Sequence, residues 1–189
     1  VGADAGTVWS SPAGSALANV QAALNGKTYF NVHSEANASG EVRGQLVGPD
    51  VFAMRAELEG QQENPAIASD GGGVGYLTAD VESGQIWANL RNTGFEASMA
   101  HVHSGFAGEN GGVVIDLEDV SAAAGEPTGT VWTQPAGAMA QNVDTLLAGG
   151  YYFNVHSETN ASGEVRGQIV GEGHGVLRAE LDGEQEVPA

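Results

Sequence analysis

The sequence contains no cysteine and no long apolar run among its 189 residues. Without cysteine the chain can form neither a disulfide nor a thiolate metal site, so this count leaves the redox compartment open. No stretch approaches the roughly 20 apolar residues that a membrane-spanning helix needs, so we expect no membrane span. Only 6 Lys and Arg accompany 24 Asp and Glu, and the net charge of -18 argues against nucleic acid and anionic membranes as partners. An acidic surface suits divalent cations or a basic partner instead.

Glycine is abundant where large apolar residues are scarce, with 29 glycines against only five phenylalanines. This composition favours a turn-rich, all-β protein with thin cores. Short alternating segments are separated by turn residues every 8–12 positions. We therefore predict a Greek-key β-sandwich or barrel.

One stretch of the sequence occurs twice. Tyr29–Leu46 returns, offset by 123 positions, within Tyr151–Ile169, and each copy reads as two strands joined by a polar loop. Aligning residues 1–66 on 124–189 without a gap gives 39 identities in 66 positions. A period of 123 residues is the size of a domain, so we predict a tandem repeat of whole domains.

This register divides the chain into three parts. Residues 1–48 correspond to the C-terminal part of a unit, residues 49–171 form one complete unit, and residues 172–189 repeat the first strand of a further unit. We expect about eight short strands and one short helix per unit. The strands of the complete unit are expected at residues 52–59, 74–81, 85–92, 98–103, 113–117 and 130–132 and in the hairpin at 151–170, and its helix near 138–147. In the first part we expect a strand at 6–10 and a helix at 15–24.

Three histidines of the complete unit are candidate metal ligands. His101 and His103 are two positions apart, so on a strand they face the same side, about 7 Å apart. His156 lies on another expected strand of the same unit and supplies a third nitrogen. A three-nitrogen site with an open position suits Cu²⁺ or Zn²⁺ better than Ca²⁺ or Mg²⁺, which prefer oxygen. Glu164 or Glu158 is expected as a fourth ligand or as a partner of a ring N–H.

The alternative to a metal site is a set of hydrogen-bonded strand histidines, and the spacing by itself leaves this open. His33, the counterpart of His156, has no His-x-His partner in the sequence, and we interpret His174 as a linker residue. We interpret Asp116, Glu118 and Asp119 as a solvated acidic edge rather than a calcium site.

Several blocks of the complete unit resemble one known family. Leu58–Pro65, Ala100–Val114, Tyr152–His156 and Gly163–Gln168 are similar to the CHRD (chordin-type) domain and occur in that family's order across residues 49–171. This resemblance implies an extracellular or cell-surface all-β module that is often repeated.

The His-Val-His strand followed by a glycine-rich loop is also similar to the copper strand of Cu/Zn superoxide dismutase. This similarity implies copper as the metal, with His101, His103 and His156 as its ligands. No zinc-loop histidine cluster, cysteine pair or clear channel arginine accompanies it, so a copper redox protein is the alternative function. We expect a structural or interaction module rather than an enzyme, whose copies assemble end to end into an array or filament, and which carries copper, or else zinc, at the three histidines.

Overall fold

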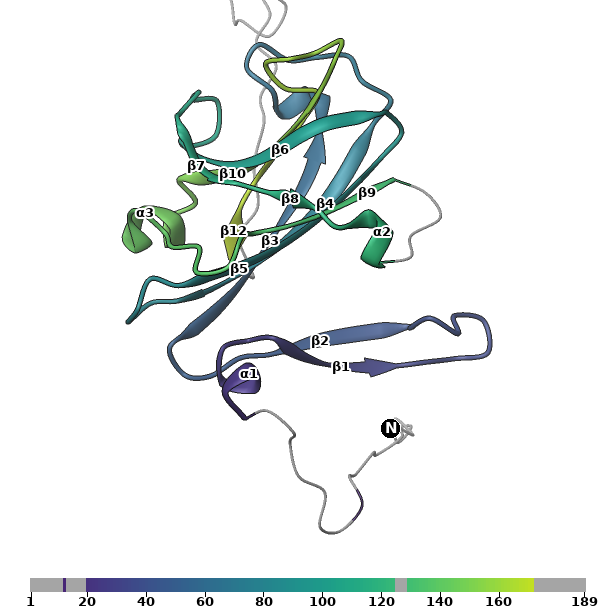
Figure 1. The fold of residues 1–189 in the computed structure, drawn as a ribbon, viewed down its shortest axis with the longest axis vertical. Helices are drawn as coiled ribbons and strands as arrows, with labels where there is room; N and C mark the ends of the chain where they lie inside the picture. Colours follow the sequence, from purple (N-terminus) through teal and green to yellow (C-terminus); the bar gives the residue numbers. More distant parts are fainter. Residues whose placement is uncertain (1–11, 13–19, 125–128, 172–189) are drawn as a thin grey trace, which may run out of the picture.

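The computed structural model describes residues 12, 20–124 and 129–171. The strand expected at 6–10, the start of the helix expected at 15–24, His174 and the segment 172–189 lie outside these residues. Most of the described chain forms one large antiparallel sheet of ten strands (Figure 1). Its strands are β3 (Val51–Glu59), β4 (Gly72–Asp80), β5 (Ile86–Thr93), β6 (Ala97–Ser104), β7 (Val113–Asp116), β8 (Glu118–Asp119), β9 (Thr130–Thr133), β10 (Tyr151–Ser157), β11 (Val165–Gln168) and β12 (Val170–Gly171).

The order of strands nearly closes this sheet on itself. The sequence of neighbours is β7-β6-β10-β11-β3-β4-β5-β9-β8, with β12 pairing beside β11 on β3. The two end strands of this order, β7 and β8, follow each other in the chain and are separated only by Leu117. The Leu117 amide donates to the Ala100 carbonyl of β6, which holds this junction against the sheet. The predicted all-β class is confirmed, as a nearly closed barrel or sandwich.

Alternation of apolar and polar residues explains the strands. In β3, Met54, Ala56 and Leu58 are buried and the residues between them are exposed, as the sequence predicts. Phe52, which the same alternation places beside them, is instead 48% exposed. Phe153 of β10 is fully buried and packs against Gly75 of β4, where an added Cβ would lie 2.5 Å from the phenyl ring. The core around these residues comprises Met54, Ala56, Leu58, Leu77, Ala79, Ile86, Ala88, Leu90, Ala100, Val102, Ile115, Leu117, Trp132, Ala138, Leu146, Tyr151, Phe153, Val155, Val165 and Ile169.

The helices are short, and the prediction of one helix per unit is wrong. The described residues hold α1 (Val20–Leu24), α2 (Ser121–Ala124), α3 (Val143–Leu147) and a 3-10 turn at Gly60–Gln62. Helix α3 begins later than expected because Asn142 caps it, its side chain accepting from the Thr145 amide. Helix α2 was not expected, and none of these helices is long and apolar enough to cross a membrane.

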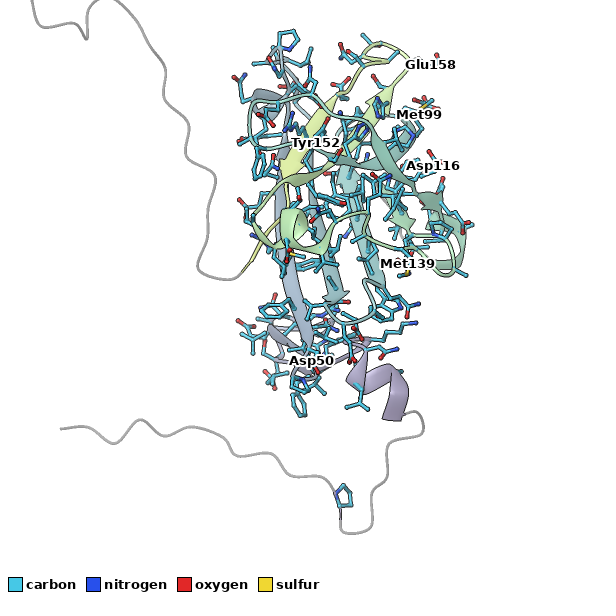
Figure 2. All side chains as sticks on the ribbon, turned by 90° about the vertical axis from the view of Figure 1, so that its left-hand side faces the viewer. Asp50, Met99, Asp116, Met139, Tyr152 and Glu158 are labelled. Carbon is cyan, nitrogen blue, oxygen red and sulfur yellow. The ribbon has the colours of Figure 1, made fainter. Side chains whose placement is uncertain are left out.

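A second, two-stranded sheet stands apart from the large one. It consists of β1 (Thr28–Val32) and β2 (Val42–Leu46), and it lies with α1 at the end of the molecule opposite the β10–β11 loop (Figure 1). Asp50 lies where this hairpin passes into β3 (Figure 2). The apolar face of the β1–β2 hairpin is open, since Phe30 is 68% exposed and Val42 61% exposed.

Candidate metal centre

Strand pairing places the three predicted histidines together. On β6, His101 and His103 pair with Asn154 and Tyr152 of β10, and His156 pairs with Met99. Because side chains alternate along each strand, all three imidazoles emerge on the same face of the β6–β10 ladder. The structure thus brings together the three residues that the sequence singles out.

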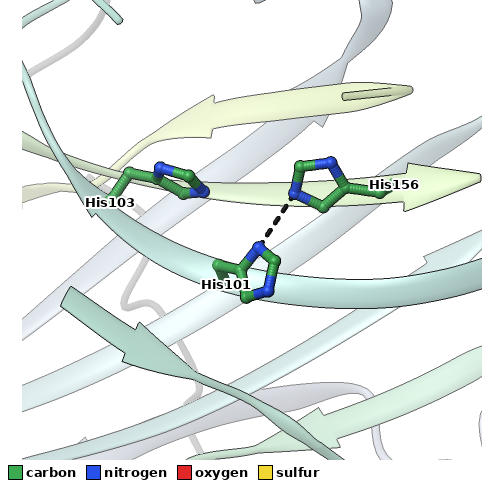
Figure 3. A group of neighbouring side chains, drawn as sticks. All are labelled: His101, His103 and His156. Carbon is green, nitrogen blue, oxygen red and sulfur yellow. Dashed lines mark hydrogen bonds between the residues drawn. The ribbon is translucent and has the colours of Figure 1, made fainter. Parts of the chain in front are cut away.

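The imidazole rings converge closely enough to share one ion. One ring nitrogen from each of His101, His103 and His156 lies within 4.8 Å of the other two. The shortest approach is 2.9 Å, between His101 Nδ1 and His156 Nε2 (Figure 3). The ring centroids of His101 lie 5.4 Å from His103 and 4.8 Å from His156.

Backbone carbonyls fix the tautomers of two of the rings. His103 Nδ1 lies 3.0 Å from the Gly111 oxygen, and His156 Nδ1 lies 3.1 Å from the Ala161 oxygen. A carbonyl oxygen only accepts hydrogen bonds, so both Nδ1 atoms carry the proton and both Nε2 atoms keep a lone pair. His103 Nε2 is buried without a hydrogen-bond partner, so its lone pair is not used within the described chain.

His101 lies between two acceptors. Its Nδ1 faces His156 Nε2, and its Nε2 lies 3.4 Å from a carboxylate oxygen of Asp116. Because His156 Nε2 is an acceptor, His101 Nδ1–H donates to it when no ion is bound. Transfer of this proton to Nε2, where it is directed at Asp116, frees the lone pair of His101 Nδ1 for an ion. A carboxylate in this place is the usual partner of a metal-ligating imidazole. In this arrangement Nδ1 of His101 and Nε2 of His103 and His156 form the ligand set.

Burial keeps the three imidazoles neutral. Desolvation lowers the pKa of His101 and of His103, and burial together with the neighbouring His101 lowers the pKa of His156 to about 4. At neutral pH the rings therefore carry no charge, and each neutral ring has one nitrogen with a lone pair. A metal ion at this site would not have to displace protons from imidazolium groups.

A buried stack supports His103 from behind. The ring of Tyr152 lies parallel to the His103 ring at 5.0 Å, and the guanidinium of Arg166 lies 3.6 Å from the Tyr152 centroid. Arg166 in turn donates to the carbonyl oxygens of Glu109 and Phe106. The Tyr152 hydroxyl accepts from the Gly111 amide, so the loop that orients His103 is itself fixed to β10.

A half-buried carboxyl, that of Glu63, lies near this stack. Burial raises the pKa of Glu63 to about 7, although the charge of Arg166 and a hydrogen bond from Asn154 favour its ionised form. The Glu63 and Asn154 side-chain oxygens leave no room for a Cβ at Gly163, and its φ of 146° also favours glycine. Glu63 comes from the turn after β3, so sequence pattern alone did not reveal its place beside β10.

Other site residues differ from their predicted places. Glu164, expected near the histidines, accepts instead from Ser157, Asn160 and Ser69. Glu158 is exposed in the hairpin loop (Figure 2). Asp116, interpreted from sequence as part of a solvated acidic edge, lies at the surface but faces His101 (Figure 2).

His33 lies apart from the cluster, on the separate hairpin. It is exposed, and its Nδ1 lies 2.9 Å from the Ala38 oxygen. No residue of the described chain completes a metal-binding group around it. Asp119 also belongs to a local structure, since it accepts from the amide and the hydroxyl of Ser121.

Comparison with known proteins identifies one family. The model of the CHRD domain family matches residues 2–46 and 54–169. The chain therefore belongs to the CHRD domain family, whose members occur in extracellular proteins. No curated protein and no solved structure matches the chain.

Proposed function

We propose that the unit at residues 49–171 is an extracellular CHRD module that binds one copper or zinc ion through His101, His103 and His156. The observation that carries this proposal is the approach of three ring nitrogens to within 4.8 Å of one another. Two of these nitrogens carry fixed lone pairs, and one of them is buried without a partner.

The donor set favours borderline and late transition metals. Imidazole nitrogen suits Cu²⁺ and Zn²⁺, whereas Ca²⁺ and Mg²⁺ require several oxygen ligands. Each proposed ligand also has its second ring nitrogen held, by Asp116 or by a backbone carbonyl. Such outer contacts raise the affinity of a histidine site and fix its geometry.

Elemental analysis and titration calorimetry of the purified chain test this proposal. After metal removal and reloading, we expect one equivalent of copper or zinc per chain and no stoichiometric uptake of Ca²⁺ or Mg²⁺. Equal weak binding of all four ions would show only the attraction of an acidic surface, and it would refute the site.

The second part of the proposal is a structural role in which copies associate end to end. The open apolar face of β1–β2 supports it, because soluble monomers rarely leave such faces uncovered. The sequence at 177–181, which repeats part of β3, is the proposed pairing strand of a neighbouring copy. Light scattering of the chain with and without residues 172–189 tests this. Monomers in both samples at high concentration would refute the array.

The alternative function is a copper-dependent redox protein similar to superoxide dismutase. The His101-Val-His103 strand with His156 supports it. A superoxide dismutation assay of the copper-loaded chain separates this alternative from simple metal binding, since a binding module gives no more turnover than free chelated copper.

A further inference from the structure

We propose that the hairpin β1–β2 can replace β10–β11 in the large sheet, so that His33 takes the place of His156 in the metal centre. This is the place in the strand order between β6 and β3, where β10–β11 lies in the structure. The chain thus has two hairpins for one position. The metal part of this inference rests on the proposed function, whereas the exchange of hairpins does not.

The two hairpins have nearly the same sequence. Residues 28–46 and 151–169 differ at only three positions, Thr28/Tyr151, Ala36/Thr159 and Leu46/Ile169. Apart from Tyr151 and Ile169, the buried side chains of β10–β11 therefore recur in β1–β2. Four side chains that bind the surroundings have the same counterparts in β1–β2. They are Tyr152 and Tyr29, Arg166 and Arg43, Gln168 and Gln45, and Glu164 and Glu41.

Hairpin β1–β2 already has the conformation that β10–β11 has within the large sheet. Its register pairs Tyr29 with Gln45, as β10–β11 pairs Tyr152 with Gln168. The His33 Nδ1 donates to the Ala38 oxygen as His156 Nδ1 donates to the Ala161 oxygen, so in both rings Nε2 keeps the lone pair. Insertion would therefore need no refolding of the hairpin itself.

The connection to β3 is long enough for β1–β2 to insert beside it. In the structure Val170 and Gly171 pair with Arg55 and Met54 of β3. Their counterparts Val47 and Gly48 precede Met54 by the five residues 49–53. Loops of 2–5 residues commonly join antiparallel neighbours. In the exchanged form β2 and β3 become an ordinary hairpin, and only the first residues of β3 leave their pairing with β4.

The exchange would cover an apolar face that now lies open. Phe30 is 68% exposed, whereas its counterpart Phe153 is fully buried against Gly75. In the exchanged form Phe30, Val32 and Val42 take the core places of Phe153, Val155 and Val165. One hairpin then buries about as much apolar surface as the other exposes, so the two forms bury similar amounts of apolar surface.

Two differences explain why β10–β11 holds the position in the structure. Tyr151 is buried and its hydroxyl accepts from the Asn142 amide, but Thr28 stands at the matching place. Leu146 of α3 is fully buried, and its counterpart in α1 is Ala23. We therefore expect exchange once β10–β11 is weakened.

Aspartate at Phe153 is the test. A charge there cannot remain in the core, so Phe153→Asp expels β10–β11. We expect this chain to stay monomeric and to unfold cooperatively at a lower Tm than the wild type. Phe30→Asp alone leaves the Tm unchanged, but Phe30→Asp combined with Phe153→Asp abolishes cooperative unfolding. Three results would each overturn exchange within one chain. Phe153→Asp could already lose cooperative unfolding, or it could form a dimer. Addition of Phe30→Asp to Phe153→Asp could also leave the Tm of Phe153→Asp unchanged.

Copper and zinc titrations of the same variants test the histidine. We expect Phe153→Asp to bind one equivalent, and His33→Ala in that background to abolish the uptake, while His33→Ala in the wild-type chain has no effect. Uptake by Phe153→Asp that survives His33→Ala would overturn the role of His33. If the wild-type chain binds no metal, the proposed function fails, but the unfolding experiment still decides whether the hairpins exchange.

Discussion

Hairpins β1–β2 and β10–β11 have almost the same sequence and the same internal structure, but they lie in opposite environments. In both, a serine hydroxyl donates to the glutamate that opens the second strand, at 2.7 Å from Ser34 and 2.8 Å from Ser157. In both, an arginine guanidinium lies over a tyrosine ring, at 3.7 Å for Arg43 and 3.6 Å for Arg166. Local sequence therefore determines the turn, the register and even this stacking contact.

Burial and chemistry come from the neighbours instead. Only β10–β11 lies between β6 and β3, and only there does the strand histidine meet two others. Arg166 is 1% exposed, and burial lowers the pKa of its guanidinium. The same motif is a surface hairpin in one place and half of a candidate metal centre in the other.

The largest expected difference concerns the matched phenylalanines. Phe153→Ala removes a fully buried ring, so we expect it to lower the free energy of unfolding by about 3–5 kcal/mol. Phe30→Ala acts on a ring that is exposed in the single chain, so in dilute, monomeric samples it should change the free energy by no more than about 0.5 kcal/mol. Urea denaturation of both variants measures this. Similar losses in both would show that β1–β2 is covered in solution.

The pH dependence of stability sharpens the comparison, because Glu63 accompanies only β10–β11. Its pKa is raised from 4.5 to about 7 on folding, so its contribution is complete below pH 4.5 and is lost as the pH rises to about 7. Glu63→Gln keeps the neutral form. After allowance for solvent screening, we expect it to raise the free energy of unfolding by about 1–2 kcal/mol at pH 8 and to change nothing at pH 4.

Urea denaturation at the two pH values checks this expectation. Glu96→Gln, at an exposed position in the turn before β6, serves as the control for loss of one negative charge. If Glu63→Gln and Glu96→Gln change stability equally at pH 8, the effect is one of net charge and the burial of Glu63 is irrelevant.

The smallest expected difference concerns the tyrosines. Tyr152→Phe removes the acceptor of the Gly111 amide, which lies 3.2 Å from the hydroxyl. The free energy of unfolding should fall by about 1 kcal/mol. Tyr29→Phe changes a ring that is 47% exposed and should have no measurable effect. Thermal unfolding of the pair checks this, and a loss as large in Tyr29→Phe would contradict the account.

The sequence predicts the parts of this fold that have a regular pattern. Alternation identifies β3 and both hairpins, and the spacing of His101 and His103 with the parity of His156 predicts their common face. The two-residue strand β8 and the short helix α2 have too few residues to show a period. Their positions depend on closure of the sheet through Leu117.

Contacts between distant segments explain the rest. Asp116 reaches His101 because β7 pairs with β6, a register that nothing in the local sequence specifies. Glu63 becomes half-buried because the turn after β3 folds over β10 and β11. Arg166 is buried because the loop before β7 covers it. For this reason the face of β10 that carries His156 is buried, as is the face that carries Phe153.

The central claim is that His101, His103 and His156 form a metal centre. His33, the exposed counterpart of His156, does not take part in it. Calorimetric titration of the wild type, His103→Ala and His33→Ala with copper and with zinc tests it most directly. We expect one equivalent for the wild type and for His33→Ala, and none for His103→Ala, with all three chains folded by circular dichroism. Unchanged stoichiometry in His103→Ala, or equal loss in both variants, would contradict the claim.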